Sequence, residues 1–231
     1  MNETDTPILI TGVERSGSSI IARIISMCRV HAGEVSGMYE NERIKVMMNN
    51  FLYGMGVDTH CQYPLLQHPM DFFPKDFAEK ITDILELEKY DSQYPWMYKS
   101  FRILNTWEIW NHFYPNAKWV IVLRRYPDVL DSCIKTSHMG AFQTLQNRKD
   151  VGAINEKAGW RWWYHEQQKQ INKIKFRADV NTFEIYPEKM AYNNFSEVYN
   201  LLDWLGLTPP ENLEETIKPL FNNSKQKQHG K

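Results

Sequence analysis

Residues 8–21 read Ile8-Leu9-Ile10-Thr11-Gly12-Val13-Glu14-Arg15-Ser16-Gly17-Ser18-Ser19-Ile20-Ile21. A β-branched run ends in a glycine, and a small polar loop leads into an apolar segment with helical spacing. This order predicts a phosphate cradle, in which loop N–H groups and a helix N-terminus face an anion. Gly12 and Gly17 keep the spacing of nucleotide-triphosphate loops, but Ser18 replaces their lysine, and Arg15 is the only cation of the loop. We therefore expect an anion chain shorter than a triphosphate.

Strand and helix patterns alternate along the chain. The pattern predicts strands at 7–11, 96–99, 118–123 and 179–185, and helices at 18–29, 40–53, 76–89, 105–113, 155–176, 195–205 and after 208. The helix at 105–113 is expected to open on a capping box, and 54–74 to form a long loop. We predict one α/β domain over 1–231 with a frayed tail at 224–231. Its mostly parallel sheet would lie between helical layers, as in P-loop folds, with the ligand at the carboxyl ends of the strands.

Composition narrows the class of protein. The 231 residues carry a formal net charge of −1 and a pI near 6.7, which gives no global electrostatic case for nucleic acid or an anionic membrane. Three cysteines without metal-like spacing suit reduced thiols in a cytoplasm. No signal-like segment begins the sequence, and no apolar run is long enough to cross a bilayer. We expect a cytoplasmic protein without a metal site; the pattern does not fix its oligomeric state.

A second anion site is predicted where the apolar strand at 118–123 runs into Arg124 and Arg125, with Pro127 opening a helix. In a P-loop kinase this strand usually ends in an aspartate that holds magnesium. The chain therefore lacks both the loop lysine and this aspartate. A kinase for a small metabolite remains an alternative, as does a non-catalytic nucleotide-binding module. One cradled phosphate and a separate cationic site suit a nucleotide with phosphates at both ends of its ribose.

These motifs resemble the P-loop sulfotransferases, particularly their small bacterial and phage-like branch. Arg15-Ser16-Gly17-Ser18-Ser19-Ile20 is similar to the family's 5′-phosphosulfate loop, and Arg124 and Ser132 match the arginine and serine that hold the 3′-phosphate. Pro127 falls one residue later than in the family, so Arg125 is the alternative to Arg124. The resemblance implies the donor 3′-phosphoadenosine 5′-phosphosulfate, no metal, and these donor-binding residues: Arg15, Ser16, Gly17, Ser18, Ser19, Arg124 and Ser132.

Weaker similarities extend over nearly the whole chain. Residues 98–102 resemble a family strand end of the form Lys-Asp-Pro-Arg, and 37–41 resemble a Gly-x-x-Glu segment before the second helix. Residues 182–184 and 201–207 are similar to the closing strand and helix of the family.

Sulfuryl transfer to a hydroxyl or amine needs a cation at the leaving oxygen and a base for the acceptor proton. From the resemblance we expect Arg15 to be that cation, Glu40 the base and Lys99 a contact of the sulfonate. Alternatives for the base are Glu42, then Glu34 or His60. Phe183 or a tryptophan would stack on the adenine, although the Trp160 and Trp163 stripe is better explained as core. The acceptor is expected to be a small molecule or glycan.

Overall fold

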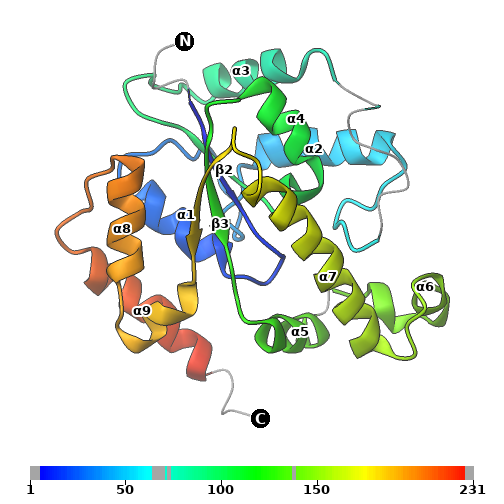
Figure 1. Cartoon of the computed structure of the whole chain (residues 1–231). Coiled ribbons are helices and arrows are strands. Elements are labelled where there is room, and N and C mark those ends of the chain that lie inside the picture. The colour runs from blue at the N-terminus through cyan, green and yellow to red at the C-terminus, as the bar shows by residue number, and fades with distance from the viewer. Residues whose placement is uncertain (1–5, 64–70, 72–73, 137–138, 227–231) are drawn as a thin grey trace.

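The computed structural model describes residues 6–63, 71, 74–136 and 139–226. Its sheet has four strands, and every pair of neighbours is parallel, in the order β2-β1-β3-β4 (Figure 1). The strands are β1 (Ile8–Thr11), β2 (Met97–Lys99), β3 (Lys118–Val122) and β4 (Asn181–Ile185). The parallel α/β sheet predicted from the sequence is confirmed.

The central strand β1 is buried along its whole length, as expected of a parallel sheet covered on both faces. Its residues alternate between two hydrophobic clusters: Leu9 belongs to one, and Ile8 and Ile10 belong to the other. The register pairs Ile10 with Lys99 of β2 and Thr11 with Ile121 of β3. The carboxyl ends of these three strands therefore meet at one edge of the sheet.

Helices cover both faces of the sheet, which gives the predicted three layers (Figure 1). One face carries α1 (Ser18–Ser26), α8 (Ser196–Leu205) and α9 (Leu213–Gln226). The other carries α2 (Glu42–Gly54), α3 (Phe77–Leu87), α4 (Ile103–Phe113), α5 (Tyr126–Lys135) and α7 (Glu156–Lys175). The described part of the chain also contains short helices that the sequence pattern does not predict: η3 (Ala141–Gln143), α6 (Leu145–Asp150) and η4 (Pro187–Tyr192).

The helix after β1 and the helix after β3 leave the sheet on opposite faces. Residues of α1 belong to the cluster with α8 and α9, whereas α5 contributes to the cluster with α4 and α7. The gap between the carboxyl ends of β1 and β3 is therefore a topological switch point, where open α/β sheets bind ligands. The loop of residues 12–17 and the loop at Arg124 both lie there.

Local capping explains several of the helix boundaries. Asn41 Oδ1 accepts a hydrogen bond from the Ile44 N–H at the start of α2, and Asn155 does the same for the Ala158 N–H of α7. Gly206, at φ 74°, ends α8 in the left-handed conformation that favours glycine.

The capping box predicted at 105–108 is wrong. Helix α4 begins earlier, at Ile103, and Thr106 lies inside it with a non-helical φ of −124°. The Thr106 hydroxyl donates to the Arg102 carbonyl at 3.0 Å, within its own helix, so this side chain distorts the first turn instead of capping a later one. The Asn105 side-chain amide donates to Gln167 Oε1 of α7 at 3.4 Å.

The remaining differences lie in loops and at the end of the chain. Residues 64–70 and 72–73 of the predicted long loop lie outside the described residues. Helix α9 reaches Gln226, three residues into the predicted tail at 224–231, and 227–231 also lie outside the description. Within the described part of the chain, no helix combines the length and apolar character needed to cross a membrane.

Candidate functional site

The loop of residues 12–17, called the opening loop below, turns sharply between β1 and α1. A Cβ on Gly12 would lie 2.2 Å from the Val122 carbonyl oxygen, so only glycine lets the loop pass this close to the end of β3. Arg15 at φ 73° and Gly17 at φ 91° are both left-handed. The Ser16 N–H donates to the Val13 carbonyl at 3.0 Å and closes the turn.

Polar groups of the loop and of the first turn of α1 remain for a ligand. The N–H groups of Ser18 and Ser19 precede the first intrahelical hydrogen bonds of α1. The Ser16 hydroxyl is buried and has no hydrogen-bond partner among the described residues. Ser19 differs, because its hydroxyl donates to the Met38 carbonyl at 2.8 Å and ties α1 to the segment before α2.

The structure brings Arg15, Arg124 and Ser132 together. The Arg124 guanidinium donates to the Arg15 carbonyl at 2.8 Å, and Arg15 Nε donates to the Ser132 hydroxyl at 2.9 Å. Arg125, the alternative, points elsewhere: its side chain is 70% exposed and pairs with Asp128 at 2.8 Å. The end of β3 and the first turns of α5 therefore contact the opening loop through Arg124 and Ser132.

A buried charge network lies at the end of β2. Glu40 Oε2 is 3.0 Å from Arg102, and Glu40 Oε1 is 3.5 Å from Lys99 Nζ. The three side chains are only 3–6% exposed. Burial lowers the pKa of Lys99, although the charges of Glu40 and of Glu14 partly oppose that shift. Lys99 Nζ also donates to the Met38 carbonyl at 3.1 Å, the same oxygen that Ser19 contacts.

The alternative bases lie in other surroundings. Glu42 pairs with Lys45 in the first turn of α2 and is 37% exposed. Glu34 is 72% exposed and lies 3.7 Å from Arg43. His60 is exposed, and its backbone N–H donates to Asp58. Of these candidates and Glu40, only Glu40 shares the buried network with Lys99.

The sequence pattern assigns no role to two members of this cluster, Arg102 and Glu14. Arg102 is 5% exposed and its guanidinium lies 4.4 Å above the Phe101 ring. Glu14 is 6% exposed, and its charge raises the pKa of Lys99. The spacing of Lys99 and Arg102 after an apolar strand is the sequence pattern that could mark Arg102 as part of the site. No sequence pattern marks Glu14, because an acidic residue in a polar loop is expected to face solvent.

The candidate aromatic side chains and the three cysteines are buried or packed against a neighbouring ring. Trp160 and Trp163 are buried in the core, as the stripe predicts. Phe183, the candidate for adenine stacking, packs against Trp204 with ring centroids 5.5 Å apart. The three cysteines are buried and unpaired, and burial raises the pKa of Cys61 and of Cys133 to about 12. Among the described residues, no group of three or more His, Cys, Asp or Glu could hold a metal ion.

Comparison with known proteins gives a consistent result. A family model described as the sulfotransferase family matches residues 7–211. A search of curated proteins finds no significant match. Among solved structures, sulfotransferase STF1 of Mycobacterium tuberculosis aligns with a TM-score of 0.53 and 12% identity, over 92% of this chain and 70% of that one. A sulfotransferase from Alicyclobacillus acidocaldarius aligns with a TM-score of 0.51 and 16% identity, over 94% and 92%. The family match covers most of the chain, and the solved structures share its fold: this protein belongs to the sulfotransferase family.

Proposed function

We propose that this protein transfers a sulfuryl group from 3′-phosphoadenosine 5′-phosphosulfate to a hydroxyl or amine of a small molecule or carbohydrate. The observation that carries the proposal is the contact of Arg15 with both Arg124 and Ser132 at the switch point of the sheet. It joins a phosphate-type loop to a second cationic site, which suits a ligand with an anion at each end.

The residues at the switch point fit such a donor. A glycine where a side chain would strike Val122, first-turn amide groups of α1 and a buried Ser16 hydroxyl without a partner suit the oxygens of a 5′-phosphate. Arg124 and the Ser132 hydroxyl supply a charged donor and a neutral donor for a 3′-phosphate. The donor brings a sulfuryl group bonded to a 5′-phosphate oxygen.

The chain's own residues would then act on the transfer in three places. Arg15 and the amides of Ser18 and Ser19 stabilise negative charge on the oxygen from which sulfur departs. As the acceptor oxygen or nitrogen forms a bond to sulfur, Glu40 takes the proton from that acceptor atom. Lys99, beside Glu40, contacts the sulfonate oxygens. The arginine and lysine carry the positive charge that this transfer needs, so we propose no role for a metal in it.

The setting of the reaction follows from the same residues. Three buried, unpaired thiols suit a reducing compartment, and we propose the cytoplasm. A net charge of −1 gives no global electrostatic case for nucleic acid, and we propose none as a partner.

Thermal unfolding with nucleotides tests this proposal. 3′-Phosphoadenosine 5′-phosphate is expected to raise the melting temperature at concentrations where ATP with magnesium does not, since ligands that bind only the folded state stabilise it. A shift with ATP and magnesium alone would favour the small-metabolite kinase. Turnover of the phosphosulfate donor in EDTA, with a phenol, an amine and a sugar as acceptors, then identifies the acceptor class.

A further inference from the structure

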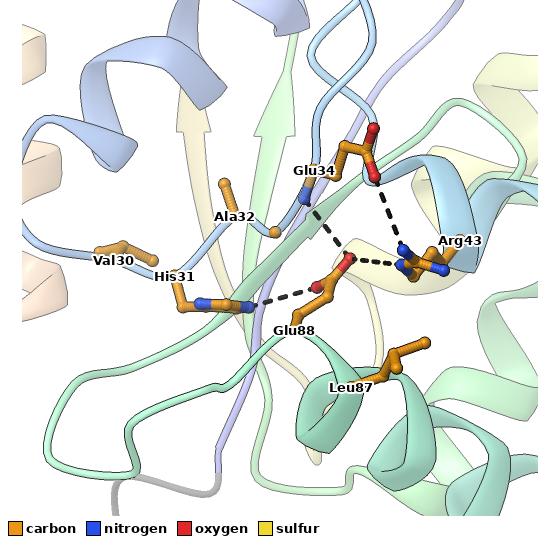
Figure 2. A pocket seen from close by; sticks show the side chains of 8 residues that line it. Val30, His31, Ala32, Glu34, Arg43, Leu87 and Glu88 are labelled. Atoms are coloured by element: carbon orange, nitrogen blue, oxygen red, sulfur yellow. Dashed lines mark hydrogen bonds and ion pairs between the residues drawn. The ribbon is translucent and has the colours of Figure 1, made fainter.

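Glu88 is a carboxylate with several polar partners that lies outside the proposed site. It follows α3 and lines the pocket drawn in Figure 2. Its side chain is only 5% exposed. It accepts from Asn41 Nδ2 at 2.9 and 3.1 Å and from the Glu34 N–H at 3.4 Å, and lies 3.3 Å from His31 and 3.7 Å from Arg43. A carboxylate at a helix C-terminus faces the negative end of the macrodipole. These partners, and not its own helix, therefore stabilise Glu88.

The partners of Glu88 come from one segment, residues 30–43, which follows α1 and runs into the first turn of α2. A pocket of about 510 Å³ opens beside the contacts and is lined by part of this segment, with Leu87 and Glu88 opposite (Figure 2). A Cβ on Gly33, at φ 67°, would lie 2.1 Å from Glu88 Oε2 and 2.0 Å from Asn41 Nδ2. The backbone thus passes directly against this hydrogen bond.

Asn41 connects Glu88 to the proposed site. Its Oδ1 caps α2, while its Nδ2 donates to Glu88 and to the Ala32 carbonyl. Both ends of the Asn41 amide are therefore fixed, and Asn41 is bonded directly to Glu40. The anchored side chain therefore belongs to the residue next to Glu40 in the chain.

The rest of the segment forms a turn that is closed by backbone hydrogen bonds. Tyr39 is left-handed at φ 61°, and the turn is closed by the Ser36 N–H donating to the Glu40 carbonyl and the Glu42 N–H donating to the Glu34 carbonyl. The same turn presents the Met38 carbonyl to Ser19 and Lys99.

We propose that Glu88 is a positioning residue: through Asn41 it holds the segment of residues 30–43 so that Glu40 meets Lys99 and Arg102. This inference rests on the proposed function for what Glu40 does. The anchoring itself is a property of the protein without any ligand.

A donor–acceptor swap tests the proposal. Asn41→Asp keeps a good helix cap but sets a second carboxylate against Glu88. Glu88→Gln removes the charge. In the double variant, the amide introduced at position 88 can donate to the carboxylate introduced at position 41, so the hydrogen bond returns with its direction reversed. The control is Glu86→Gln, an exposed position on the same helix.

The first readout is amide hydrogen exchange, which needs no ligand. In Asn41→Asp the Ser36 and Glu42 amides are expected to exchange at least about tenfold faster than in Glu86→Gln, with recovery in the double variant. The second readout is release of sulfate from the phosphosulfate donor with water as acceptor, divided by the number of sites that bind 3′-phosphoadenosine 5′-phosphate. We expect each single variant to lose about tenfold to a hundredfold and the double variant to regain most of it.

The two proposals fail differently. If the wild-type protein neither binds 3′-phosphoadenosine 5′-phosphate nor releases sulfate, the proposed function is wrong, and the exchange rates still decide the role of Glu88. If Asn41→Asp exchanges like Glu86→Gln, or if the double variant is no better than Asn41→Asp, the positioning role of Glu88 is refuted. Counting binding sites separates mispositioning from a loss of folded protein.

Discussion

Replacing Glu40 with glutamine tests the buried charge network directly. The wild-type carboxylate lies between Arg102 at 3.0 Å and Lys99 at 3.5 Å, and its side chain is 5% exposed. Glutamine keeps the shape and one acceptor oxygen but removes the negative charge. Two buried cations would then face a neutral amide.

The cost can be worked out from this geometry. Breaking a buried ion pair by removing one partner costs about 3–5 kcal/mol. Because glutamine still accepts a hydrogen bond, we expect the lower end, about 3 kcal/mol. At about 2–4 °C for each kcal/mol in a chain of this size, the melting temperature falls by about 6–12 °C. Apart from this loss of stability, the loss of a general base lowers kcat by a factor of about 10²–10⁴.

The assay compares Glu40→Gln with Glu42→Gln. Glu42 forms only a partly exposed pair with Lys45, which is worth about 1 kcal/mol at most. Unfolding is followed by circular dichroism, and donor-site integrity by calorimetric titration with 3′-phosphoadenosine 5′-phosphate below both melting temperatures. Affinity in Glu40→Gln should stay within about threefold of wild type, under about 0.7 kcal/mol.

Two results would refute this reasoning separately. Equal melting temperatures for the two variants would mean that the network does not hold Glu40 as described. A kcat close to wild type in Glu40→Gln, with the donor bound normally, would remove Glu40 as the base.

Three further predictions concern the opening loop, the two arginines and a thiol. Gly12→Ala drives a Cβ toward the Val122 carbonyl, so thermal unfolding should show a loss of at least about 1–3 kcal/mol; an unchanged melting temperature contradicts the close approach. Arg124→Met should lower the affinity for 3′-phosphoadenosine 5′-phosphate by about tenfold to a hundredfold in calorimetry, whereas Arg125→Met should not. Equal effects of the two substitutions would contradict the placement of Arg124, and not Arg125, at the 3′-phosphate. Burial raises the pKa of Cys133 to about 12, so above pH 9 the unfolded chain loses a thiol proton that the folded protein keeps. The free energy of unfolding in urea should fall between pH 9 and 12, and less steeply in Cys133→Ala; identical slopes would contradict the buried thiol.

Features that depend on neighbouring residues could be predicted from the sequence. The end of α8 at Gly206 and the stripe of α7 follow from a left-handed glycine and from helical spacing. The start of α4 could not be predicted, because Thr106 bonds back to Arg102 within the helix instead of capping a new one. Local preference does not distinguish these two uses of a threonine hydroxyl.

In the candidate site, too, a motif of neighbouring residues could be predicted, whereas contacts between distant residues could not. The opening loop could be predicted because its residues are contiguous. Which of the two adjacent arginines faces the loop could not be predicted, because it depends on contacts with other segments: Arg124 bonds to the Arg15 carbonyl, and Arg125 pairs with Asp128 of α5. The pairs Glu40–Arg102 and Asn41–Glu88 join residues far apart in the sequence, and no local pattern marks either contact.

We expect one nucleotide to engage the opening loop and Arg124 together, through phosphates at opposite ends of its ribose. Calorimetric titration of the wild-type protein with 3′-phosphoadenosine 5′-phosphate, adenosine 5′-phosphate and adenosine 3′-phosphate tests it directly. The bisphosphate should bind at least about tenfold more tightly than either monophosphate, a gain of about 1.4 kcal/mol or more from the second anion. Equal affinity for adenosine 5′-phosphate and the bisphosphate would contradict the account.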